Sequence, residues 1–175
     1  MAVSRAEWCA RDIIGRLKLE YPVAVDVVAQ TYNVTIQRQV LEEEVSGILV
    51  IKGERAVIAV NGNHHPNRQR FTIAHELGHY LLHREASSVF IDATTVFFRD
   101  QRSSEGTKWQ EVEANSFAAE LLMPTIALTE VLRDQVGEHL LDELDDAVIR
   151  RLAAHFGVSI QALTVRLVRL GFIAA

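Results

Sequence analysis

The stretch that decides the fold is residues 70–83, RFTIAHELGHYLLH, in which three histidines follow one another at intervals of four residues. At about 100° per residue, one arc of a helix collects the polar residues Thr72, His75, Glu76, His79, Tyr80 and His83. The opposite arc is almost wholly apolar, which predicts a buried helix with one polar stripe. Because unpaired polar groups are costly to bury, another part of the chain must supply partners for this stripe.

Two histidines at positions i and i+4 of one helix can give two nitrogen ligands to a tetrahedral zinc ion. His75 and His79 have this spacing, and Glu76 would lie beside the metal, where a carboxylate can accept a proton from water. The only cysteine, Cys9, excludes a cysteine-rich zinc knuckle, so further ligands must be histidine or carboxylate. The five-residue pattern also arises by chance, but a buried helix with a polar arc is the context that it needs.

The third histidine of the stripe, His83, has a different expected role. The helix rises about 12 Å between His75 and His83, which is too far for one coordination sphere. We expect His83 to support another ligand or to face the substrate, with an ordinary hydrogen-bonded histidine as the alternative.

A second predicted helix, residues 109–123 in WQEVEANSFAAELLMP, offers carboxylates for a third ligand and ends at Pro124. Its candidates are Glu111, Glu113 and Glu120, and helical spacing alone does not choose among them. Three more polar residues have possible roles near the site. Asn115 could hold a ligand or a backbone carbonyl, with a plain surface amide as the alternative, and Tyr80 and Arg70 are candidates to stabilise an oxyanion.

The remaining patterns predict a single α+β domain. Residues 1–33 read as helices, and residues 34–123 combine the metal-site helices with a small antiparallel sheet, formed by the runs VTIQRQVL, SGILVIKG and RAVIAVNG. Residues 85–108 lack clear periodicity and are predicted to form a long loop with one strand near residues 96–98. Residues 124–175 read as a helical C-terminal part.

Composition and charge exclude several classes of protein. No run approaches the roughly 20 apolar residues of a membrane-spanning helix, and charges interrupt the N-terminal residues where a signal peptide would be apolar. We therefore expect a cytoplasmic protein without a membrane partner. The net charge of −5 argues against a global attraction to nucleic acid but leaves room for a local basic patch. The sequence gives no indication of the oligomeric state.

The C-terminal sequence AVIRRLAAHFGVSIQALTVRLVRLGFI, residues 147–173, has the pattern of a helix-turn-helix, with a turn at Gly157 and an N-cap at Ser159. It contains no acidic residue and four basic ones, Arg150, Arg151, Arg166 and Arg169. The leucines of the second helix are nevertheless expected to pack in the core, and the helix has few side chains that could form hydrogen bonds with base edges. Direct DNA binding is therefore not expected. The alternative function is a DNA-binding or protein-binding regulator, or a toxin–antitoxin component, with a structural metal site.

The two central blocks, RFTIAHELGHYLLH and EVEANSFAAELLMP, resemble the ImmA/IrrE family of metallo-endopeptidases. The likeness extends to SGILVIKGERAVIAVNG and to LAAHFGVSIQALTVRLVRLGFI, so it covers most of the chain. The order of elements is also similar to that of thermolysin-like zinc peptidases.

The resemblance implies specific roles. His75, His79 and Glu113 would bind one Zn²⁺ per chain, or another divalent metal, and Glu76 would be the general base. Glu111 is a minor alternative ligand, and Glu120 is expected to be structural or solvent-exposed. The implied substrate is a cognate helix-turn-helix repressor of the XRE type, whose cleavage would regulate stress-response or mobile-element genes.

Overall fold

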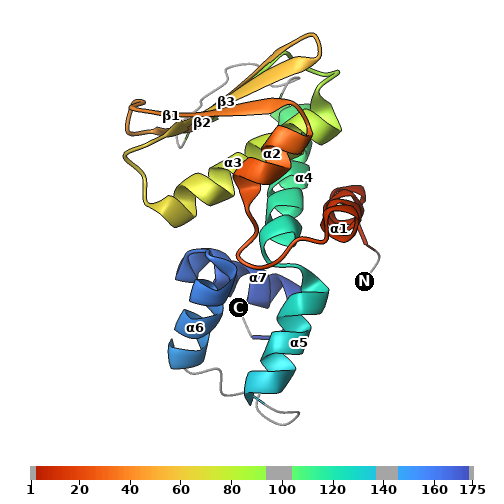
Figure 1. The fold of residues 1–175 in the computed structure, drawn as a ribbon, viewed down its shortest axis with the longest axis vertical. Coiled ribbons are helices and arrows are strands. Elements are labelled where there is room, and N and C mark those ends of the chain that lie inside the picture. The colour runs from red at the N-terminus through yellow and green to blue at the C-terminus, as the bar shows by residue number, and fades with distance from the viewer. Residues whose placement is uncertain (1–2, 94–103, 137–145, 174–175) are drawn as a thin grey trace.

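The computed structural model describes residues 3–93, 104–136 and 146–173, and it confirms the α+β class. A sheet lies at one end, α3 and α4 pass beneath it, and the C-terminal helices form the other end (Figure 1). The elements, in chain order, are α1 Arg5–Leu17, α2 Val25–Thr31, β1 Val34–Gln39, β2 Val45–Lys52, β3 Arg55–Asn61, α3 Pro66–His83, β4 Val89–Ala93, α4 Ser104–Leu122, α5 Thr125–Val136, α6 Asp146–Phe156 and α7 Ile160–Leu170.

The sheet is mixed, whereas the sequence predicted an antiparallel one. Its strand order is β1-β3-β2-β4, with β2 antiparallel to both β3 and β4. Strand β3 inserts between β1 and β2 and runs parallel to β1, with Val34 opposite Ala56. The first two strands therefore do not form a hairpin, although they are consecutive and separated by only a short connection.

The segment predicted as a loop, residues 85–108, contains regular structure. Strand β4 occupies residues 89–93 and α4 begins at Ser104, earlier than the sequence indicated. A five-residue strand at a sheet edge is too short to show a reliable alternation of polar and apolar residues. The strand expected near residues 96–98 lies outside the described residues.

Helix α3 is the centre of the fold. It begins at Pro66 after the N-cap His65, whose ring accepts a hydrogen bond from the backbone N–H of Asn67. Every residue from Thr72 to Tyr80 is buried, as the polar-stripe pattern predicted. The helix lies beneath the sheet and packs along α4 (Figure 1).

Two glycines allow neighbouring elements to approach α3 closely. A Cβ atom at Gly47 in β2 would collide with the Thr72 methyl group and lie 3.3 Å from Glu76 Oε1. A Cβ atom at Gly78 would lie 3.1 Å from Ala114 Cα in α4. Any larger side chain at these positions would push the sheet or α4 away from the histidine helix.

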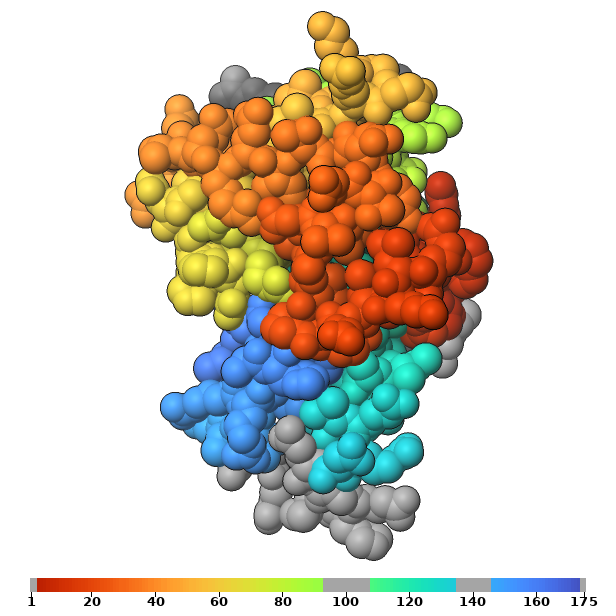
Figure 2. All heavy atoms as spheres, viewed as in Figure 1, coloured from red at the N-terminus to blue at the C-terminus, as the bar shows by residue number. Residues whose placement is uncertain are grey.

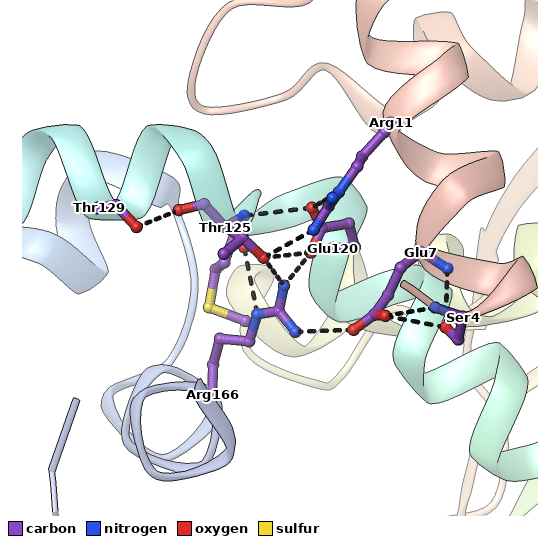
Figure 3. Close-up of polar contacts among 8 residues, drawn as sticks. Ser4, Glu7, Arg11, Glu120, Thr125, Thr129 and Arg166 are labelled. Atoms are coloured by element: carbon purple, nitrogen blue, oxygen red, sulfur yellow. Dashed lines mark hydrogen bonds and ion pairs between the residues drawn. The ribbon is translucent and has the colours of Figure 1, made fainter. Parts of the chain in front are cut away.

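The C-terminal helices are tied to the rest of the chain by a buried polar network around Arg166 of α7 (Figure 3). Arg166 is only 2% exposed and forms an ion pair with the fully buried Glu120 of α4. It also donates to the Met123 carbonyl oxygen at 3.3 Å and lies 3.7 Å from a carboxylate oxygen of Glu7. Arg11 of α1 donates to Glu120 at 2.7 Å. Of the two roles expected for Glu120, the structure shows the structural one.

The turn between α6 and α7 has the predicted helix-turn-helix features. Gly157 adopts a positive φ of 62°, and the Ser159 side chain accepts a hydrogen bond from the backbone N–H of Ala162. In the space-filling view, the C-terminal helices pack directly against the part of the molecule that contains the start of α3 (Figure 2). Arg70 of α3 contributes to this junction by donating to the Gly157 carbonyl oxygen at 3.0 Å.

Candidate metal centre

Two imidazoles and one carboxylate converge between α3 and α4. The Nε2 atoms of His75 and His79 lie 3.0 Å apart, and each lies 3.2 Å from an oxygen of Glu111. The three residues offer ligand atoms that all lie within 4.8 Å of one another. Both histidines are buried, and the Glu111 side chain remains 42% exposed, so the group is reached from one side.

The structure differs from the sequence prediction in the carboxylate that joins the histidines. Glu113 does not face His75 and His79, because its Oε2 lies 2.9 Å from Nε2 of His83. Residues 111 and 113 are about 200° apart around a helix, so they do not both reach His75 and His79. The contact between Gly78 and Ala114 turns the face of α4 that carries Glu111 toward α3.

Asn115 lies one helical turn after Glu111 and contacts the first histidine. Its Oδ1 is 3.1 Å from Nδ1 of His75, which can therefore donate a hydrogen bond to the amide oxygen. With the proton on Nδ1, the lone pair of Nε2 points toward Glu111 and His79. This contact matches the ligand-holding role considered for Asn115.

His83 and Glu113 form a similar support for the second histidine. Nδ1 of His83 lies 3.3 Å from Nδ1 of His79, and both rings are buried. If His79 keeps its proton on Nδ1, it donates to His83, and His83 then donates from Nε2 to Glu113. When His75 and His79 both carry their proton on Nδ1 and His83 carries its proton on Nε2, the Nε2 lone pairs of His75 and His79 are both free to bind a metal.

Glu76 is fully buried next to this group and has no hydrogen-bond partner for either oxygen among the described residues. Burial raises its pKa to about 8; the charge of His75 opposes this shift, and the carboxylates of Asp92 and Glu111 add to it. A buried carboxyl group with two unpartnered oxygens normally has a further partner, such as a water molecule or substrate. Glu76 is therefore placed to exchange a proton with a molecule bound beside the histidines.

Burial and the contacts within the group shift the pKa values of His75, His79 and Glu111. Although burial alone would lower the pKa of His75, hydrogen bonding to Glu111 and the nearby charge of Glu76 raise it. Burial lowers the pKa of His79, and Glu111 offsets this only in part. Partial burial would raise the pKa of Glu111, but hydrogen bonds from both histidines hold it well below its usual range.

The donor set fits a divalent metal. When both imidazoles are neutral with their protons on Nδ1, two nitrogen lone pairs and a carboxylate oxygen converge, and three acceptors this close repel one another unless a cation or a proton lies between them. Two histidines and one glutamate are also a known ligand set of catalytic zinc, which keeps a fourth position for water or substrate.

Two predicted site residues are not brought into this group. Tyr80 packs in the hydrophobic core, with the Arg84 guanidinium 5.9 Å from the centre of its ring. Arg70 is directed to the turn between α6 and α7 by its bond to Gly157. Among the described residues, neither forms a hydrogen bond or ion pair with His75, His79 or Glu111.

Comparison with known families agrees with this geometry. Residues 29–168 match the profile of a peptidase family described as the IrrE N-terminal-like domain. The chain belongs to this family. The resemblance of its two central blocks to ImmA/IrrE proteins is thereby confirmed, and His75, His79 and Glu111 form a group that could hold a metal ion in a chain of this metallopeptidase family.

Individual relatives of this IrrE-like chain come from phage and bacteria. An uncharacterized immunity region protein 2 of Bacillus phage phi105 is 33% identical over 97 residues, which are 55% of this chain and 56% of the phage protein. A solved structure of a Mycobacterium tuberculosis transcriptional regulator has the same fold, with a TM-score of 0.63 at 17% identity. The match covers 93% of this chain and 46% of the regulator, so this chain spans about half the length of each relative.

The helices of the described residues do not meet the requirements for crossing a bilayer. None of them combines sufficient length with sufficient apolar character.

Proposed function

We propose that this protein is a zinc-dependent endopeptidase in which His75, His79 and Glu111 bind the metal. The observation that carries the proposal is the convergence of two buried histidines and a carboxylate beside Glu76, whose oxygens have no hydrogen-bond partner within the described part of the chain. This assignment replaces Glu113 with Glu111 as the third ligand. Glu113 and His83 then support His79 from behind, as Asn115 supports His75.

The proposed peptide hydrolysis uses the bound zinc ion and Glu76. When bound, zinc would polarise a peptide carbonyl and lower the pKa of water. Glu76 would accept the proton of the attacking water and deliver it to the leaving amine. Gly47 keeps strand β2 close to Glu76 without filling the space beside its carboxylate.

The proposed substrate is a cognate helix-turn-helix repressor of the XRE type in the cytoplasm. Support comes from the IrrE-like family and from the phage relative, which is named for an immunity region. Cleavage of a repressor would release the genes that it represses, in a stress response or in a mobile element.

A DNA-binding regulator is the alternative, favoured by the helix-turn-helix arrangement of α6 and α7. Burial of Arg166 weakens it, because this arginine is held by Glu120 and cannot contact phosphates. Arg150, Arg151 and Arg169 remain exposed. Salt-dependent DNA binding by a Glu76→Gln variant would support the regulator, since such binding does not require catalysis.

The direct test is to incubate the zinc-loaded protein with the repressor encoded nearest its own gene and to analyse the products by mass spectrometry. Wild type should produce two fragments, and Glu76→Gln should retain zinc but produce none. His75→Ala should lose both zinc and cleavage. A purified wild-type protein that binds no zinc-class metal, with a His75→Ala variant of unchanged activity, would overturn the proposal.

A further inference from the structure

A pocket of about 600 Å³ lies next to the candidate metal centre, between α3, α4 and α7. Phe71 precedes His75 by one turn of α3, and Ala119 follows Asn115 by one turn of α4, and both line the pocket. Asn115 belongs to both places, since it lines the pocket and contacts His75. One helical turn is about 5.4 Å, so the pocket begins within about two residues of an extended peptide from the metal group.

Helix α7 supplies the third wall of this pocket. Ala162, Val165 and Arg169 of α7 face the pocket, opposite the residues of α3 and α4. Arg166 anchors α7 in this position through the buried ion pair with Glu120. The second helix of the helix-turn-helix is therefore part of the groove wall.

The pocket combines apolar side chains with polar ones and has a positive charge at its rim. Six of its thirteen lining residues are apolar, namely Phe71, Ala119, Met123, Val158, Ala162 and Val165, and none of the described residues that line it is an aspartate or glutamate. Three arginines also line the pocket. Glu120 offsets the charge of Arg166, and Arg68 donates a hydrogen bond to the Ser46 hydroxyl at 2.9 Å. The third, Arg169, is exposed at the rim. An occupant that matches this lining has a bulky apolar group and a nearby carboxylate.

We propose that this pocket is the substrate side-chain site of the enzyme and that it selects peptides with a large apolar residue beside the scissile bond and an acidic residue close to it. The inference rests on the proposed peptidase function. The apolar side chain would lie over Phe71 and Ala119, and the carboxylate would pair with Arg169. The volume lies in the range of ordinary ligand pockets and admits a leucine, methionine or phenylalanine side chain.

The charge of the rim can be tested by reversal. Short fluorescein-labelled peptides with a central leucine and a neighbouring glutamate, glutamine or lysine serve as probes. The Arg169→Glu variant should bind and cleave the glutamate peptide about tenfold or more less well than wild type does. It should bind and cleave the lysine peptide better than the glutamate peptide. Arg151→Glu is the matched control, because Arg151 is an exposed arginine of α6 that does not line the pocket.

The size of the pocket can be tested by filling it from its exposed side. Val165→Trp should reduce use of the central leucine peptide by about tenfold or more, while a central alanine peptide is much less affected. Ile126→Trp is the control, because Val165 and Ile126 are both 63% exposed and Ile126 lies on α5 outside the pocket. The exposure of both positions limits any effect on folding.

Binding is measured by fluorescence anisotropy in the zinc-loaded Glu76→Gln background, and cleavage is measured in the wild-type background. In one outcome, Val165→Trp and Arg169→Glu change peptide binding as expected, but the wild-type protein cleaves none of the peptides. This result would support the pocket and overturn the proposed peptidase. In another outcome, the protein cleaves the peptides, but neither Arg169→Glu nor Val165→Trp changes which peptides it prefers. This result would overturn the proposed pocket without contradicting the proposed peptidase activity. Failure of wild type to bind any of the peptides would also overturn the pocket.

Discussion

Each metal-facing histidine has its second ring nitrogen next to a polar partner. His75 faces Asn115, and His79 faces His83, which in turn faces Glu113. A metal ligand needs a defined tautomer, and such outer partners define it. The chemistry of the site thus depends on residues beyond the three proposed ligands.

We expect the two neighbouring glutamates of α4 to affect zinc affinity to different extents. Glu111→Gln removes a charged ligand and should abolish tight zinc binding. Glu113→Gln removes only the support of His83 and His79, and should weaken zinc binding by about 10- to 100-fold. Competition with a chromogenic chelator measures both affinities. A larger loss with Glu113→Gln than with Glu111→Gln would restore Glu113 as the ligand.

Glu76 should make the stability of the metal-free protein depend on pH. Burial raises its pKa from 4.5 to about 8, so the folded state holds this proton more tightly than the unfolded chain. The resulting stability is complete below the unfolded pKa and is lost as the pH rises through about 8.

The free energy of unfolding of metal-free wild type should therefore fall relative to Glu76→Gln between about pH 5 and about pH 9, by on the order of a few kcal/mol. Urea unfolding of both proteins in the presence of a chelator measures this difference. If the two proteins keep a constant difference across this range, Glu76 does not have a raised pKa.

Among the secondary-structure elements, the candidate metal centre depends on a contact between two helices, so the separation of α3 and α4 matters as much as the proposed ligands. Gly78 of α3 lies against Ala114 and Phe117 of α4, and this contact holds Glu111 opposite the histidines. The glycine was visible in the sequence, but its role depends on the approach of α4.

We expect Gly78→Ala to lower both stability and zinc affinity. Its Cβ atom would lie 3.1 Å from Ala114 Cα and 3.2 Å from the Phe117 ring, so α3 and α4 must separate. The free energy of unfolding should fall by about 1–3 kcal/mol. Thermal unfolding and the chelator competition measure the two effects.

Gly15→Ala in α1 is the control for this substitution. A Cβ atom at Gly15 meets no atom within 4 Å, so this change should stabilise the helix by about 0.5–1 kcal/mol and leave zinc affinity unchanged. Similar effects of the two substitutions would show that the contact of Gly78 does not position α4.

At the scale of the whole molecule, one buried arginine connects the C-terminal helices to the helices that carry the metal site. Arg166 pairs with Glu120 of α4 and lies near Glu7 of α1, while Arg11 donates to Glu120 from the other side (Figure 3). These contacts hold α7 against the groove beside the metal centre.

Removal of one partner of this pair should be strongly destabilising. Arg166→Met leaves the buried charge of Glu120 with less compensation, and the expected loss is about 3–5 kcal/mol of unfolding free energy. The double variant Arg166→Met, Glu120→Leu should recover much of this loss, because it removes both buried charges. Denaturant unfolding of the two single variants and the double variant gives the coupling energy, and purely additive effects would contradict a coupled pair.

Features that depend only on neighbouring residues could be predicted from the amino-acid sequence. The spacing of residues 70–83 predicted a buried helix and paired His75 and His79 with Glu76, because one helix carries all three. The break at Pro124 and the Gly157 turn were likewise local signals. The two central blocks also indicated the family, since they occur together and in order.

Tertiary structure decided the features that require two distant segments to meet. It placed Glu111 rather than Glu113 beside His75 and His79, and the contact of Ala114 with Gly78 fixes how α4 faces α3. It inserted β3 between β1 and β2, and it buried Arg166. These outcomes depend on how whole elements pack, and periodicity within one element carries no information about which face its neighbour will cover.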